Sequence, residues 1–147
     1  MRTITRAFLG LALLAAAAAA HGQVQARAAW VRGTVDGQTT AGAYMELTSD
    51  RGASLLGAES PAAGSAEIHE MKMEGNVMRM RAVPKLDLPP GKTVELKPGG
   101  HHMMLVDLKR PLKKGDLVPI RLRIELRDKT IRTIQVVAEV RGLSGRD

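Results

Sequence analysis

Strict alternation of apolar and charged side chains near the end of the chain is the feature that most constrains its fold. Every second position from 120 to 126 is apolar, with arginine or glutamate between: Ile120, Leu122, Ile124 and Leu126. Successive side chains of a β-strand point to opposite faces, so this pattern predicts a strand over residues 117–126 with one buried and one solvated face. Asp128 and Lys129 form the expected turn to a second strand over residues 130–140.

The preceding part of the chain repeats this type of structure. Short stretches rich in Val, Ile and Leu are interrupted by Gly and Pro about every eight to twelve residues, which is typical of all-β domains. Further strands are predicted at 29–32, 41–49, 54–59, 65–73, 77–83, 93–96 and 103–108. We therefore expect an all-β fold, either a β-sandwich or a small barrel.

The N-terminal segment has the features of an export signal. Arg2 and Arg6 precede an apolar run at 7–20, which is too short to span a bilayer comfortably. We expect a signal peptide over residues 1–20 and a single domain over 21–147; cleavage after Ala26 is the alternative. The sequence has no cysteine, so we expect no disulfide, no lipid on a processed cysteine and no stable membrane insertion after cleavage. The mature protein is expected to be soluble and periplasmic.

The chain is basic, with a formal net charge of +7. A basic surface suits an acidic protein partner or an anionic membrane face. Nucleic acid is not an expected partner, because only Trp30 and Tyr44 are aromatic beyond the signal and the basic residues do not gather on one element.

An unusual set of methionines lies in a predicted hairpin over residues 68–83. Gly75 and Asn76 suit a two-residue turn. The resulting register places three pairs opposite each other: Met73 with Met78, Met71 with Met80, and Glu70 with Arg81. One face then carries only sulfur and imidazole donors: His69, Met71, Met73, Met78 and Met80. Methionine is also an adaptable core residue, so packing remains the alternative explanation for Met71, Met73 and Met78.

A second group of donors follows the turn at 98–100. In an extended chain His102 and Met104 share one face, while His101 and Met103 take the other. His102 and Met104 therefore offer one imidazole and one thioether, as His69 and Met80 do in the hairpin.

The donor types select the metal. Thioether sulfur is soft and uncharged, so with imidazole it favours Cu(I) over Zn(II), Mg(II) or Ca(II). A blue-copper centre and covalent c-type haem both need cysteine, which is absent.

The donors follow the spacing His69-x10-Met80-x21-His102-x-Met104. This spacing resembles the metal-binding signature of the PCu(A)C-type periplasmic copper chaperones. Flanking segments are also similar to that family: 29–32, 41–45, 68–70, 77–81, 94–100 and 108–112. The resemblance implies a cupredoxin-like Greek-key β-sandwich that holds Cu(I) with His69, Met80, His102 and Met104. It leaves Met71 and Met73 open as accessory ligands.

The resemblance further implies a non-enzymatic carrier. The implied acceptor is the copper A centre in cytochrome c oxidase subunit II, with a Sco-type thiol protein as a further partner. Storage or copper resistance is one alternative, and a metal-free secreted sandwich is another. A copper enzyme would need an acid or base, and Glu70, interpreted as the only carboxylate beside the cluster, is expected on the opposite face.

Overall fold

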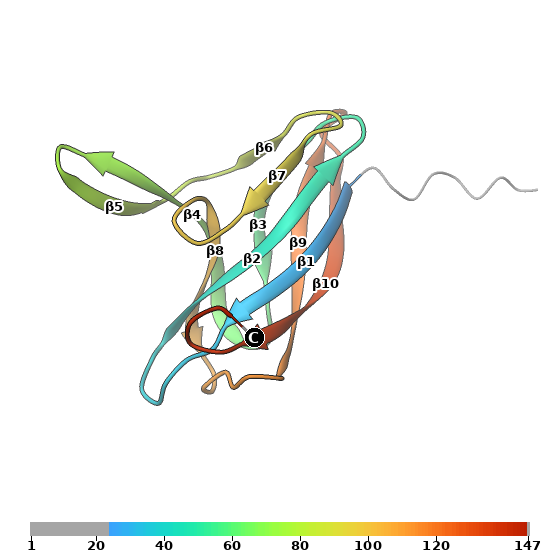
Figure 1. The fold of residues 1–147 in the computed structure, drawn as a ribbon. Coiled ribbons are helices and arrows are strands. Elements are labelled where there is room, and N and C mark those ends of the chain that lie inside the picture. Colours follow the sequence, from blue (N-terminus) through green and yellow to red (C-terminus); the bar gives the residue numbers. More distant parts are fainter. Residues whose placement is uncertain (1–23, 147) are drawn as a thin grey trace, which may run out of the picture.

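The computed structural model describes residues 24–146, and this part of the chain contains ten β-strands and no helix (Figure 1). The strands are β1 (Val24–Arg32), β2 (Thr40–Ser49), β3 (Ala53–Glu59), β4 (Ala63–Glu74), β5 (Val77–Ala82), β6 (Leu86–Leu88), β7 (Thr93–Leu96), β8 (His102–Leu108), β9 (Leu117–Leu126) and β10 (Ile131–Arg141). The predicted all-β fold is confirmed.

The strands hydrogen-bond in the order β5-β4-β8-β2-β1-β10-β9-β3-β6, and β7 pairs with β2. A further pairing of β3 with β4, at Ala58 and Ala66, connects the second strand of this order to the second from last. The sheet thus folds over into two layers around one core, with β1 and β10 pairing in parallel. Among the described strands, β5, β6 and β7 each pair with one neighbour only and so lie at edges of the sheet.

Neighbouring rows of cross-strand partners point to opposite faces of the sheet. One row runs through β4, β8, β2, β1 and β10 and lies in the core: Ile68, Met103, Ala43, Val31 and Val140. The adjacent row includes His69, His102, Tyr44 and Trp30, so it lies on the outer face. The period of two in a strand therefore separates the core from the candidate metal ligands by a single residue.

The predicted strands are confirmed with small shifts at their ends. Val118, Ile120, Leu122 and Ile124 are completely buried, as the alternation required. Two features were not predicted: β6, and the first half of β1. Ala28 has a φ of 51°, and the β1–β2 register shifts between Arg27 and Trp30, so a β-bulge interrupts the pattern there.

The expected signal segment, 1–20, lies outside the described residues. Residues 24–26 belong to β1, where they pair with β2 from Leu47 to Ser49. Cleavage after Ala26 would remove these pairings. Within residues 24–146, no helix is long and apolar enough to cross a membrane.

The β4–β5 hairpin has the predicted register, with Met73 opposite Met78 and Met71 opposite Met80. In Figure 1 it projects from the body of the molecule as a separate arm. The exposed fractions of Met73 and Met78 are 58% and 48%. The packing explanation is therefore wrong for these two methionines, because they lie outside the core. Met103, in contrast, is completely buried, as expected of a core residue.

Candidate metal centre

Three adjacent strands carry the four candidate ligands. His69 on β4 lies directly opposite His102 on β8, and their ring centroids are 5.7 Å apart. Met80 comes from β5, and Met104 lies two residues beyond His102, on the same face of β8. The hairpin and the strand after the turn at 98–100 therefore meet as predicted, because β4 pairs with both β5 and β8.

A direct contact joins one histidine to one methionine. His102 Nε2 lies 3.0 Å from Met80 Sδ. The other ring nitrogen, Nδ1, donates to the carbonyl oxygen of Gly100 at 3.0 Å. In a neutral imidazole this leaves Nε2 with a lone pair, so two electron-pair donors face each other without a hydrogen between them. A soft cation is the partner that both atoms can bind.

His69 shows the same division of roles between its two nitrogens. Its Nε2 lies 2.8 Å from a carboxylate oxygen of Glu67, to which it donates in the neutral ring. Its Nδ1 is buried and has no hydrogen-bond partner among residues 24–146. Buried polar atoms are rarely left unpaired, so this nitrogen is an orphan that a metal ion would satisfy.

Glu67 is the residue that sequence reasoning missed. It lies on the same face of β4 as His69, directly opposite Met104. The interpretation of Glu70 as the only carboxylate beside the cluster was therefore wrong. Counting back two residues from His69 would have found Glu67, because alternate residues of a strand share a face. Metal-binding histidines commonly donate their second N–H to a carboxylate or carbonyl, as both histidines do here.

Two aromatic rings pack beside His102. The ring centroids of Tyr44 and His102 are 6.4 Å apart, and those of Tyr44 and Trp30 are 4.5 Å apart. The guanidinium of Arg141 lies 4.7 Å from the Trp30 ring centroid, over its face. Gly42 makes room for this stack, since a Cβ there would collide with the Tyr44 side chain.

The centre is shallow on its hairpin side. His102 is only 6% exposed and the His69 side chain 14%, whereas Met80 is 49% exposed. Met104 is half-buried. The imidazoles are therefore fixed by packing, while a thioether at the surface is free to move.

Glu70 lies on the opposite face of the hairpin, as predicted. Its carboxylate accepts from Arg81 Nε at 2.6 Å, and this hydrogen bond holds the pKa of Glu70 below its usual value. The neighbouring His101 side chain is 40% exposed, with Nε2 3.6 Å from Glu70. These residues form a surface ion-pair cluster that does not join the four candidate ligands.

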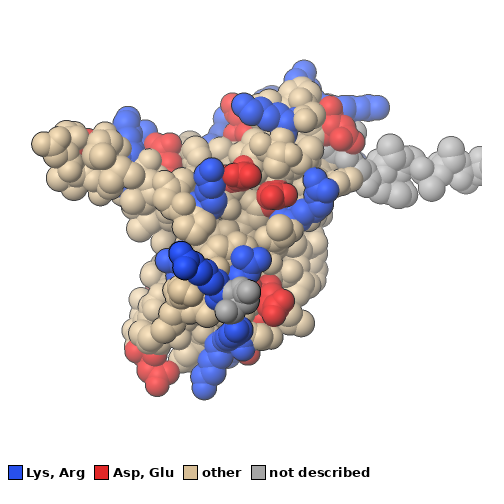
Figure 2. All heavy atoms as spheres, viewed as in Figure 1, with Lys and Arg blue, Asp and Glu red and all other residues tan. Residues whose placement is uncertain are grey.

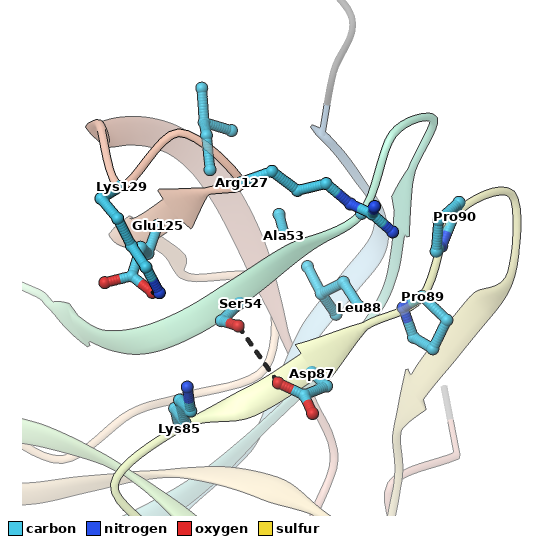
Figure 3. Close-up of a pocket in the computed structure, with 12 residues that line it drawn as sticks. Ala53, Ser54, Lys85, Asp87, Leu88, Pro89, Pro90, Glu125, Arg127 and Lys129 are labelled. Carbon is cyan, nitrogen blue, oxygen red and sulfur yellow. Dashed lines mark hydrogen bonds and ion pairs between the residues drawn. The ribbon is translucent and has the colours of Figure 1, made fainter.

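An open groove lies elsewhere, between the start of β3, the region of β6 and the end of β9 (Figure 3). Its volume is about 530 Å³, and Ser54 Oγ donates to Asp87 Oδ1 within it at 3.1 Å. No histidine or methionine lines this groove, so it offers no soft donor.

Residues 24–136 match the family described as putative lipoprotein LpqE-like. The chain belongs to the LpqE-like family. This LpqE-like chain is 37% identical over 101 residues to the putative lipoprotein Lxx21020 of Leifsonia xyli subsp. xyli. The match covers 68% of this chain and 61% of that relative, so the chain spans less than two thirds of the relative's length.

Solved structures share the fold of this LpqE-like chain. The apo PCuAC domain from PmoF1 has a TM-score of 0.67 at 24% identity, covering 82% of this chain and 95% of that domain. The solution structure of CuI-DR1885 from Deinococcus radiodurans has a TM-score of 0.60 at 36% identity, covering 77% of this chain and 74% of that protein. These similarities confirm the cupredoxin-like architecture.

Proposed function

We propose that this protein is a metallochaperone that binds one Cu(I) ion through His69, Met80, His102 and Met104. The contact between His102 Nε2 and Met80 Sδ carries the proposal, because two lone-pair donors from different strands face each other at 3.0 Å. The buried, unpaired Nδ1 of His69 supports it from the opposite strand. The copper-loaded form of the similar D. radiodurans protein adds independent support for Cu(I).

The site suits transfer rather than permanent storage of the ion. Histidines held by Glu67 and Gly100 keep two donors in place, while the exposed Met80 can exchange with a donor on an acceptor. Cu(I) stays Cu(I) throughout such an exchange, and no bond within the protein breaks. The protein would therefore act as a carrier and not as an enzyme.

We propose an exported location and an acceptor in the cell envelope. The family and its Leifsonia relative are both described as putative lipoproteins, which supports export. Thioethers neither form disulfides nor titrate, so a His/Met site keeps working in the oxidising periplasm. The copper A centre of cytochrome c oxidase subunit II is the proposed acceptor, with a Sco-type thiol protein as a further partner.

Competition for Cu(I) against a colorimetric chelator tests the binding step. The native protein is expected to withdraw one tightly held equivalent, and His102→Ala and Met80→Leu are expected to weaken this competition strongly. Met103→Leu is the matched control, since Met103 neighbours His102 but packs in the core. If the native protein does not compete, or if both ligand variants compete as well as the control, the proposal is wrong.

Transfer is tested separately with a purified copper A domain. Loaded native protein should pass Cu(I) to the apo domain, and a variant lacking all four ligands should not. Tight binding without transfer would contradict the carrier role and favour storage instead.

A further inference from the structure

The outer half of the β4–β5 hairpin carries methionines that the four-ligand centre does not use. Beyond the His69–His102 pair, β4 and β5 pair only with each other among the described strands. This part of the hairpin projects from the body (Figure 1). Met73 and Met78 are about half exposed, and Met71 is half-buried.

The register brings these thioethers together. Met73 lies directly opposite Met78, and the next pair inward on the same face is Met71 and Met80. Side chains directly opposite each other have Cβ atoms about 5 Å apart, and two residues along a strand advance about 7 Å. Methionine has three rotatable bonds, so the sulfurs of Met71, Met73 and Met78 can converge on one ion. The Met73–Met78 pair is therefore the next pair on this face outward from Met80, which is a candidate ligand of the main centre.

The charges of the hairpin lie on its other face. Arg79 forms an ion pair with Glu74 at 3.1 Å, and Arg81 forms one with Glu70. Seen from the side drawn in Figure 2, most of the projecting hairpin surface carries no charged side chain. A methionine face without lysine, arginine or carboxylate neither repels a monovalent cation nor holds hard ions such as Mg(II).

Packing does not account for the choice of sulfur at these positions. Leucine fills a similar volume, and Met73 and Met78 leave about half of their surface in water. What methionine adds at an exposed position is a soft, uncharged donor atom.

We propose that Met73 and Met78, together with Met71, form a second and weaker Cu(I) site at the outer end of the hairpin. This outer site, which rests on the proposed function, is the point where Cu(I) enters or leaves the protein. The ion would pass between the outer site and the main centre through the Met71–Met80 pair. Each step replaces one ligand of Cu(I) by another, so no electron or proton is transferred.

Nuclear magnetic resonance of the protein with 13C-labelled methionine methyl groups tests the second site. Cu(I) is added stepwise under reducing conditions. The first equivalent should shift the methyl signals of Met80 and Met104, and the second should shift those of Met73 and Met78. If the Met73 and Met78 signals stay in place after both equivalents, or if they move together with Met80 at the first, a separate second site is wrong.

Two sets of variants separate this inference from the main centre. The double variant Met73→Leu and Met78→Leu keeps the apolar surface but removes the sulfurs, so it should lose the second equivalent and keep the first. The double variant Met80→Leu and His102→Ala should lose the tight equivalent while the Met73 and Met78 signals still respond. Retention of the second equivalent after the leucine substitutions would overturn the proposal.

The outcomes distinguish the two proposals. If the native protein binds one equivalent at Met80 and Met104 and none at Met73 and Met78, the outer site is excluded and the proposed metallochaperone function still holds. A protein that binds no Cu(I) at Met80 and Met104 would contradict the proposed function itself.

Discussion

At the scale of single residues, Glu67 decides which nitrogen of His69 faces the candidate centre. Its carboxylate accepts from Nε2 at 2.8 Å and leaves Nδ1 buried and unprotonated in the neutral ring. Removing such a partner of a metal-binding histidine commonly lowers metal affinity about 10–100-fold. We expect Glu67→Ala to weaken Cu(I) binding by this order, as measured by chelator competition.

A carboxylate on the other face of the same strand provides the control for Glu67. Glu74 forms an ion pair with Arg79 at the hairpin surface, so Glu74→Ala should leave Cu(I) affinity near the native value. Glu67→Gln should retain part of the affinity, because its amide oxygen can still accept from Nε2. Equal affinities of the native protein and Glu67→Ala would show that His69 needs no such partner.

Gly42 supports the centre through the aromatic stack. A Cβ at position 42 would come within 2.8 Å of Tyr44 Cζ and closer still to the hydroxyl oxygen. Gly42→Ala must therefore displace the Tyr44 ring, which lies against both Trp30 and His102. We expect a loss of about 1–3 kcal/mol in the free energy of unfolding, as for other overpacked sites, and weaker Cu(I) binding.

Trp30 is the only tryptophan, so its fluorescence reports on this displacement directly. The emission of Gly42→Ala should differ from that of the native protein. Ile131→Ala is the control, since Ile131 is 48% exposed at the start of β10 and belongs neither to the aromatic stack nor to the candidate centre. Unchanged emission and affinity in Gly42→Ala would mean that Tyr44 does not position His102.

At the scale of elements, local alternation was enough to predict most strands and the hairpin register. The turn at Gly75 and the opposite charges of Glu70 and Arg81 defined the pairing of β4 with β5, and the structure has that pairing. The exposure of Met73 and Met78 could not be predicted in this way, because alternation shows which side chains share a face but not whether another strand covers that face. Here β8 pairs with β4 only as far as His69, so the outer part of the hairpin is left uncovered by β8.

Two further elements, the first half of β1 and the short strand β6, could not be predicted from local alternation. The bulge at Ala28 shifts the alternation of β1, so its first half was not recognised as a strand. β6 is only three residues long, and its pairing with β3 is set by tertiary contacts. Glu67 is not adjacent to His69 in sequence, as Glu70 is, but a strand places alternate residues on one face and so brings Glu67 beside His69.

The loop between β8 and β9 should make stability depend on pH. The Asp116 carboxylate accepts from the Lys113 N–H at 2.9 Å and from Arg110 at 2.8 Å, which holds the pKa of Asp116 below its usual 3.8. A depressed pKa in the folded state gives stability that is complete above 3.8 and is lost as the pH falls through the folded value. The native protein should therefore be more stable than Asp116→Asn near neutral pH.

Thermal unfolding at about pH 6 and about pH 3 checks this linkage. The difference in melting temperature between the native protein and Asp116→Asn should shrink at the lower pH. Asp36→Asn, in the exposed turn between β1 and β2, is the matched control for the loss of one surface carboxylate charge. A difference that stays constant with pH would mean that Asp116 stabilises the loop only through its shape.

At the scale of the whole molecule, the candidate centre ties the projecting hairpin to the body. Its ligands come from β4, β5 and β8, and β5 pairs with no strand but β4 in the described part of the chain. An ion held by Met80, His69 and His102 would join the exposed strand to two strands of the core sheet. Copper binding should therefore stabilise the folded protein and also restrict the hairpin.

The size of this stabilisation follows from binding linkage. A ligand present at about 100 times its dissociation constant, and bound only by the folded state, adds about 2.7 kcal/mol to the free energy of unfolding. We expect Cu(I) to raise the melting temperature of the native protein and to slow amide hydrogen exchange in β5. Zn(II) should raise the melting temperature and slow the exchange of β5 only weakly, because two of the four donors are thioethers. The variant Met80→Leu, made together with Met73→Leu and Met78→Leu so that the outer site is also removed, separates the two effects. His69, His102 and Met104 remain within the body, so Cu(I) should still raise the melting temperature somewhat, but β5 should exchange as fast as in the metal-free protein. Protection of β5 in this triple variant would show that Met80 does not link the hairpin to the ion.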